Sequence, residues 1–258
     1  MKSRATRRGL ALTELGLGAA QFGNLYQETS DEASRAATDA AWDAGIRYFD
    51  TAPHYGLGLS ERRLGAALRT RPRDELVVST KAGRALVPNP GGENEQDDGF
   101  VVPATLRREW DFSRDGIRRS LDGSLERLGL DYVDILYLHD PDHHEEQARR
   151  EAIPALIELR EEGLVRAVGA GMNQSAMLAR FVTDFDIDVV MLAGRYTLLE
   201  QGALDDLLPA ALEHRVAVVA AAVYNSGLLA TATVRSDARY DYGDVPPELL
   251  SRTRKIAE

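Results

Sequence analysis

The sequence predicts an α/β fold in which parallel strands alternate with helices around a barrel. Short apolar runs alternate along the chain with amphipathic segments of helical length, as in strands joined by helical crossovers. Three of these runs end in ionisable residues, and barrel enzymes keep their sites at the C-terminal ends of the strands. The 258 residues suffice for one such domain, and no linker-like stretch divides them. We therefore expect a single domain over residues 1–258.

The expected elements follow in order. A glycine-rich first strand lies within 15–23, where Gln21 replaces the third glycine of a dinucleotide-binding fingerprint, so tight barrel packing is the favoured interpretation. A helix at 30–44 follows, with acidic residues in its first turn and Gly45 after its end. The further strands are expected at 47–50, 76–80, 133–138, 165–169, 189–192 and 216–223. The further helices are expected at 61–69, 113–128, 149–162, 174–182, 204–214 and 247–257.

One long loop, at about 82–112, interrupts this alternation. Prolines and glycines at 88–92 precede an acidic run, a composition typical of mobile, solvated surface. Loops of this length inside a compact domain are functional covers or disordered segments. Phe100, Trp110 and Phe112 are candidates to wall a substrate pocket, and packing against the barrel rim is an equal alternative.

The composition excludes several classes of function. The 31 Lys and Arg residues against 41 Asp and Glu give a net charge of −10, which argues against general affinity for nucleic acid or a membrane surface. The absence of cysteine rules out disulfides and thiolate catalysis. No apolar core of a secretion signal follows the basic start, and no apolar run approaches about 20 residues. We expect a cytoplasmic protein acting on a small molecule, as a monomer or a homo-oligomer.

Four polar residues are expected to meet at one rim of the barrel. Asp50, Lys81 and His139 each end an apolar run, and Tyr55 lies in the loop after the first. Each has a structural alternative, as a loop cap, a partner for a surface acid or a hydrogen-bonded core histidine. Their shared position at strand ends favours a site.

Such a group suits proton transfer at a C–OH or C=O group. A free tyrosine has a pKa of about 10, and a nearby lysine cation stabilises the phenolate. A carboxylate keeps the lysine charged, while a histidine orients the carbonyl or alcohol. A proton relay that needs neither nucleophile nor metal fits hydride transfer. No side chain can carry the hydride, so a nicotinamide cofactor is implied.

These residues carry a resemblance to the aldo-keto reductase family. It rests on FDTAPHYG at 49–56, SERRLG at 60–65, STK at 79–81 and YLH at 137–139, and it extends over nearly the whole chain. Segments 71–75, 111–116, 139–142 and 193–199 are most similar to the branch of D-threo-aldose 1-dehydrogenases, L-fucose dehydrogenases and pyridoxal 4-dehydrogenases. The resemblance implies a (β/α)8 TIM barrel and a catalytic tetrad of Asp50, Tyr55, Lys81 and His139, with Tyr55 as proton donor or acceptor.

The resemblance also implies NADP or NAD as cofactor. The expected contacts are Asn173, Gln174, Arg195, Tyr196, Tyr224, Asn225, Ser226, Gly227 and Leu228. Asn173 resembles the family's carboxamide-binding asparagine, and 224–228 resembles its pyrophosphate-binding turn, whose amides suit an anion. Two positions depart from the pattern: Ala193 replaces a glutamine and Ala221 an aromatic ring.

Substrate contacts are expected from His54 and Trp110, although His54 filling its loop is equally favoured. No metal is expected, because the acids and histidines of 140–145 crowd into one loop that is better read as solvated and partly substrate-facing. Family members continue past a position like Glu258 into an eighth strand and a segment that holds the adenosine end. We therefore expect a barrel lacking that strand, with weak cofactor binding or a partner over the gap if the chain ends there.

Three functions stay open at this point. The favoured one is oxidation of an aldose of the fucose or galactose type at C1, or reduction of a small carbonyl, with a pyridoxal 4-dehydrogenase activity as its variant. The second is an aldolase or isomerase in which Lys81 forms a Schiff base. The third is a barrel that binds cofactor or a partner without turnover, suggested by Ala193 and Ala221.

Overall fold

Seven parallel strands form the central sheet of the computed structural model, which describes residues 1–97, 99–234, 238–241 and 243–257. The strands are β3 (Gly16–Gly18), β4 (Tyr48–Asp50), β5 (Val77–Ala82), β8 (Val133–His139), β9 (Val165–Met172), β10 (Val189–Ala193) and β11 (Ala217–Ala221). Their order in the sheet follows their order in the chain. The expected parallel α/β barrel of seven strands is confirmed. In the described part of the chain β3 and β11 do not pair, so the barrel is open between them.

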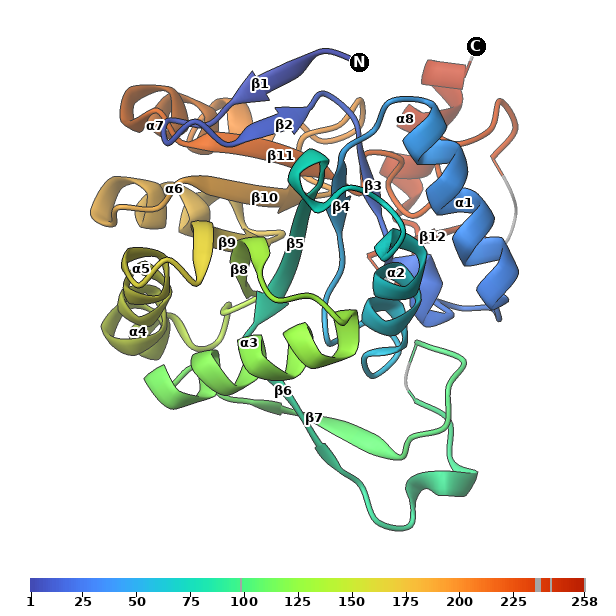
Figure 1. Ribbon diagram of the computed structural model, residues 1–258. Helices are drawn as coiled ribbons and strands as arrows, with labels where there is room; N and C mark the ends of the chain where they lie inside the picture. The colour runs from blue at the N-terminus through green and yellow to red at the C-terminus, as the bar shows by residue number, and fades with distance from the viewer. Residues whose placement is uncertain (98, 235–237, 242, 258) are drawn as a thin grey trace.

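Helices cover the outer face of this sheet, and Figure 1 shows α1, α2 and α3 outside it. The helices are α1 (Asp31–Asp43), α2 (Leu59–Leu68), α3 (Arg114–Leu128), α4 (Glu145–Gln147), α5 (Ile153–Glu161), α6 (Ser175–Asp184), α7 (Leu207–His214) and α8 (Pro247–Ala257). The hydroxyl of Ser30 accepts a hydrogen bond from the backbone amide of Ala33 at 3.1 Å, and this N-cap defines the start of α1. Among the helices of the described residues, none has the length and apolarity needed to cross a membrane.

Shorter helical turns connect these elements. They are η1 (Ala20–Gly23), η2 (Arg73–Glu75), η3 (Gly92–Asn94), η4 (Ala148–Ala152) and η5 (Gly202–Leu204). The helix expected at 149–162 therefore begins earlier, at Glu145, and passes through η4 before α5.

Three antiparallel hairpins were not expected from the sequence. They are β1 (Ser3–Ala5) with β2 (Ala11–Thr13), β6 (Arg84–Pro88) with β7 (Leu106–Trp110), and β12 (Arg239–Tyr240) with β13 (Gly243–Asp244). The long loop expected at about 82–112 therefore contains two paired strands, whose residues are exposed or half-buried as expected of surface. The loop is ordered because Phe100 and Val102 are buried against Leu57. Figure 1 shows this hairpin at the bottom of the view and the β1–β2 hairpin at the top.

The core has two layers. The larger cluster fills the space between the sheet and the helices, with Phe49, Leu136 and Phe181 fully buried. The smaller cluster lies inside the barrel and includes Tyr48 and Tyr137. Both faces of the inner strands are thus buried, as in parallel sheets generally, whereas β3 and β11 at the open seam are partly exposed.

Candidate active site

The alternation of side chains along the strands turns three of the predicted residues into the barrel. Asp50 follows the interior residue Tyr48 by two positions, and His139 follows Tyr137 in the same way. The same alternation turns Lys81 inward. All three side chains lie at the C-terminal ends of β4, β5 and β8.

Lys81 and Asp50 form a buried ion pair. The ammonium of Lys81 donates to Asp50 Oδ2 at 2.6 Å and to the carbonyl of Thr51 at 2.8 Å, and Ser79 donates to Asp50 Oδ1 at 2.6 Å. The Lys81 side chain is 2% exposed. Burial is the largest single effect and lowers the pKa of Lys81, but the charges and hydrogen bonds of Asp50 and Tyr55 together outweigh it, and the net pKa is raised. Lys81 is therefore a permanent cation.

Tyr55 lies against this cation. The Lys81 Nζ atom is 4.7 Å from the centre of the Tyr55 ring. Burial raises the pKa of Tyr55 above its usual value, while the charge of Lys81 and a hydrogen bond from it act in the opposite direction. The expected lowering by Lys81 is thus present but smaller than the effect of burial.

Two histidines complete the cluster. The ring of His139 lies 6.0 Å from that of Tyr55 and 5.6 Å from that of His54. Burial, followed by the nearby charge of Arg84, lowers the pKa of His54 to about 2 and holds that of His139 well below its usual range. Both rings are therefore neutral at physiological pH. Within the described residues, neither Nδ1 atom has a hydrogen-bond partner.

Close backbone packing fixes the loop that carries Tyr55. Gly56 has φ +61°, and a Cβ atom there would lie 2.2 Å from the carbonyl oxygen of Gly23. Only glycine fits so near the neighbouring backbone. Asp50, Tyr55, Lys81 and His139, predicted separately from the sequence, therefore lie together in the structure.

The β6–β7 hairpin adds two arginines that sequence reasoning missed. Arg108 binds Asp97 through both terminal nitrogens, at 2.5 and 2.6 Å, and donates to the carbonyl of His54 at 2.8 Å. Arg84 forms an ion pair with Asp140, the residue after His139. The only sequence signal for these contacts was the basic and aromatic content of the long loop.

A cavity of about 550 Å³ opens beside the cluster. It is lined by Arg84, Trp110, Asp140, Asp142, His143, His144, Asn173, Gln174, Met177, Arg195 and Asp241. Trp110 therefore faces a cavity as predicted, whereas Phe100 and Phe112 are buried and pack against the rim. In the described part of the chain, no three acids or histidines are arranged to hold a metal ion.

The comparisons with known proteins agree with this geometry. The model of the aldo/keto reductase family matches residues 14–256. The chain belongs to this family. It is 55% identical to a D-threo-aldose 1-dehydrogenase of a Pseudomonas species, over 98% of this chain and 78% of that protein. It is 40% identical to a pyridoxal 4-dehydrogenase of Microbacterium luteolum, over 97% of this chain and 78% of that protein.

A solved structure agrees as well. An aldo-keto reductase from Bacillus halodurans, in its holo form, aligns with a TM-score of 0.74 and 28% identity. The alignment covers 93% of this chain and 72% of that one.

The residues expected to hold the cofactor of this aldo-keto reductase fall into two groups. Asn173, Gln174 and Arg195 line the cavity. Asp241 contacts two of them. It accepts a hydrogen bond from the side-chain amide of Asn173 at 3.4 Å and forms an ion pair with Arg195. Arg195 also donates to the Tyr240 hydroxyl at 3.0 Å.

The remaining expected cofactor residues do not line this cavity. They are Tyr196, Tyr224, Asn225, Ser226, Gly227 and Leu228. Asn225 is buried and donates to the Gly194 carbonyl at 3.0 Å, while its Oδ1 atom has no hydrogen-bond partner in the described part of the chain. Tyr224 is 60% exposed. The turn at 224–228 is thus tied to the loop after β10.

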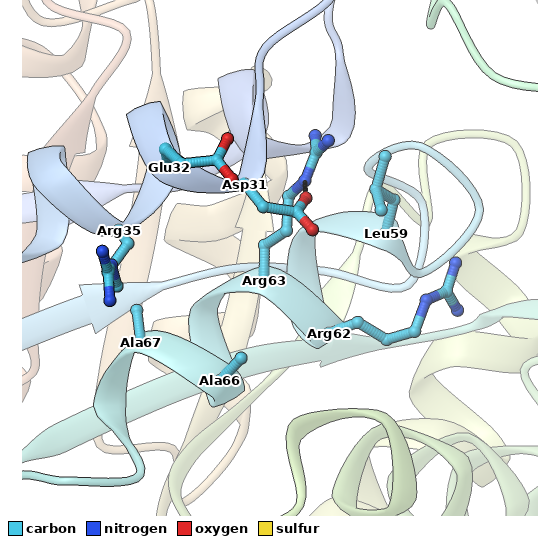
Figure 2. Close-up of a pocket in the computed structure, with 8 residues that line it drawn as sticks. All are labelled: Asp31, Glu32, Arg35, Leu59, Arg62, Arg63, Ala66 and Ala67. Atoms are coloured by element: carbon cyan, nitrogen blue, oxygen red, sulfur yellow. Dashed lines mark hydrogen bonds and ion pairs between the residues drawn. The ribbon is translucent and has the colours of Figure 1, made fainter.

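A second hollow, of about 500 Å³, lies between α1 and α2. Figure 2 shows Arg63 reaching toward Asp31 across it, and these two form an ion pair at 2.7 Å. Arg62 points away from that pair in the same view. None of the lining residues belongs to a strand end, so this hollow is separate from the candidate active site.

Proposed function

We propose that this aldo-keto reductase uses NAD or NADP to oxidise an aldose of the fucose or galactose type at its anomeric carbon, or to reduce a small carbonyl. The observation that carries the proposal is the buried Asp50–Lys81 pair held against Tyr55 and beside the neutral ring of His139. The 55% identity to a D-threo-aldose 1-dehydrogenase supports the sugar as substrate.

The side chains divide the proton chemistry among them. Tyr55 exchanges a proton with the substrate oxygen, and Lys81 stabilises the phenolate that forms when Tyr55 gives its proton up. Asp50 keeps Lys81 charged and in place. His139, being neutral, donates a ring N–H to the same oxygen and orients it without adding a competing charge.

The cofactor site is proposed to begin at Asn173. Its side-chain amide offers both a donor and an acceptor at the cavity wall, which complements a carboxamide. Arg195 and the backbone amides of 224–228 suit phosphate oxygens. When bound, the nicotinamide supplies the hydride acceptor or donor. Asp241 has to release Asn173 and Arg195 for these contacts to form.

The Schiff-base alternative is disfavoured by the state of Lys81. A lysine that forms a Schiff base attacks as the neutral amine, and enzymes lower its pKa for that purpose. The ion pair with Asp50 raises the pKa of Lys81 instead. A pyridoxal 4-dehydrogenase activity stays as the second candidate, because a relative of that name is 40% identical.

The test is absorbance of the reduced nicotinamide with L-fucose, other galactose-type sugars and pyridoxal, with NAD and NADP in turn. We expect turnover with a sugar, and a fall in kcat of about 10²–10⁴-fold in Tyr55→Phe. Tyr132, just before β8 at the opposite end of the strands, provides the control, since Tyr132→Phe keeps its ring and should keep its kcat. Turnover of pyridoxal alone would select the second candidate. Full turnover by Tyr55→Phe would remove Tyr55 from the chemistry.

A further inference from the structure

One charged pair at the cavity has no role in the proton chemistry. Asp140 directly follows His139, and its Oδ2 atom lies 3.6 Å from His139 Nε2. The same carboxylate forms an ion pair with Arg84, at the start of β6. Their side chains are 27% and 16% exposed, so the pair lies at the cavity surface and not in the core.

The backbone of Asp140 is in a strained conformation. Its φ is +44°, in the left-handed region that residues with a side chain rarely adopt. The amide of Asp140 donates to the Gly171 carbonyl at 3.0 Å, which ties the strained residue to the end of β9. Strain of this kind persists where the surrounding structure enforces it, and it concentrates at functional sites.

An aromatic wall stands beside the pair. The guanidinium of Arg84 lies 4.5 Å from the centre of the Trp110 ring. Phe112 stacks on Trp110, with ring centres 5.7 Å apart and planes inclined at 21°. Trp110 is braced in this way, yet it is 49% exposed and lines the cavity.

Together these groups match a polyhydroxylated ring. A carboxylate accepts a hydrogen bond and a guanidinium donates one, so the pair satisfies a hydroxyl group that does both. The exposed part of the Trp110 ring suits the apolar C–H groups of a sugar. Because Asp140 Oδ2 lies 3.6 Å from His139 Nε2, which orients the reacting oxygen in the proposed function, a hydroxyl held by Asp140 fits the carbon next to the one that reacts.

We propose that Arg84 and Asp140 are specificity-determining residues that bind the hydroxyl on the carbon adjacent to the reacting carbon of the sugar. This inference rests on the proposed function of the site. It assigns the pair to substrate selection, whereas Tyr55, Lys81 and His139 carry the chemistry.

The test compares L-fucose with 2-deoxy-L-fucose in the wild type and in Asp140→Asn and Arg84→Gln. We expect the wild type to prefer L-fucose in kcat/KM by about 100-fold or more, and each variant to lose at least about 10-fold of that preference. Activity toward the deoxy sugar should change much less. Asp74→Asn, an exposed aspartate at the opposite end of the strands, is the matched control and should keep the preference. Equal losses for both sugars would show a purely structural role and overturn the proposal.

Binding of the two sugars, measured by saturation-transfer NMR with NADP present, separates this inference from the proposed function. Selective binding of L-fucose that Asp140→Asn abolishes, without turnover in any protein, would support the inference and remove the proposed function. Turnover of both sugars at equal efficiency by the wild type would support the proposed function and overturn the inference. Absence of both binding and turnover would overturn both.

Discussion

The charge of Lys81 depends on one carboxylate. Asp50 meets its ammonium at 2.6 Å in a setting where the two side chains are 2% and 10% exposed. Removing one partner of a buried pair leaves the other charge without compensation, which costs more than the pair itself contributes. Stability and catalysis are therefore coupled at this residue.

We predict that Asp50→Asn lowers the free energy of unfolding by about 3–5 kcal/mol in urea titrations. The double variant Asp50→Asn with Lys81→Met should recover much of this loss but no activity, because the buried charge is gone together with the group that acts on Tyr55. Glu14→Gln is the matched control, since Glu14 pairs with Arg4 at the surface and the change should cost under about 1 kcal/mol. A fully stable Asp50→Asn protein would contradict the coupling.

The two buried histidines predict an acid-sensitive fold. The pKa of His54 is about 2 and that of His139 is also depressed, while an unfolded histidine titrates near 6.5. Below about pH 6.5 the unfolded chain binds protons that the folded chain does not, so stability is full above this pH and is lost as the pH falls. Each histidine contributes a slope of up to about 1.4 kcal/mol per pH unit.

Unfolding titrations between pH 6.5 and about 4 measure this slope. We expect His54→Gln to reduce it by about one proton, and the exposed His143→Gln to leave it unchanged. Equal slopes in the wild type and His54→Gln would mean that His54 takes up its proton in the folded protein.

At the scale of elements, the β6–β7 hairpin brings a long loop onto the site. Its attachment runs through Arg108, whose guanidinium joins Asp97 to the carbonyl of His54. Asp97 is 8% exposed, so this ion pair is largely shielded from solvent. The hairpin and the Tyr55 loop are therefore expected to move together.

We predict that Arg108→Met releases the hairpin. Peptides from 84–110 should exchange amide hydrogens at least about 10-fold faster by mass spectrometry, with little change in β8 and β9, because local openings are independent of the core. KM for the sugar should rise along with this exchange. The neighbouring Arg107 pairs with Glu109 at the surface, and Arg107→Met should leave the exchange unchanged.

The hairpin also shows where prediction from the sequence stops. Asp50, Lys81 and His139 could be placed because parallel strands end at the same rim, so an ionisable residue after each apolar run is enough to locate it. The meeting of Arg84 with Asp140 could not be predicted, because it depends on a hairpin register in which Arg84 lies opposite Trp110. The proline, glycine and acidic residues between β6 and β7 predict a loop, so the sequence gives no sign of that pairing.

The cofactor positions stay predictions, and only part of them line the cavity, for a related reason. Asn173 and Arg195, expected from the family resemblance and from their places after strands, lie at the cavity. The turn at 224–228 depends on contacts across loops, such as the bond from Asn225 to Gly194, which a pattern along one strand does not contain.

At the scale of the whole molecule, the end of the barrel opposite the site is held by a second charged cluster. Asp188, fully buried just before β10, accepts the amide of Val168 at 3.0 Å, Arg160 at 2.7 Å and Arg8 at 2.7 Å. These partners come from β9, α5 and the β1–β2 connection. One carboxylate therefore joins the N-terminal hairpin to the barrel.

We propose that residues 1–258 unfold as one domain and that Asp188 is among the contacts that make the unfolding cooperative. Asp188→Ala should remove one carboxylate partner from Arg160 and Arg8, which both keep Asp186, and should leave the buried amide of Val168 unpaired. The cost of about 2–3 kcal/mol should lower Tm by roughly 5–10 °C in calorimetry. The transition should stay single and kcat at low temperature should be unchanged, because the candidate active site lies at the other end of the strands. The exposed Asp205→Ala is the control and should shift Tm by no more than about 2 °C. Two separated transitions in the wild type would show that the chain contains two folding units, since a barrel with one continuous core has no boundary at which to divide.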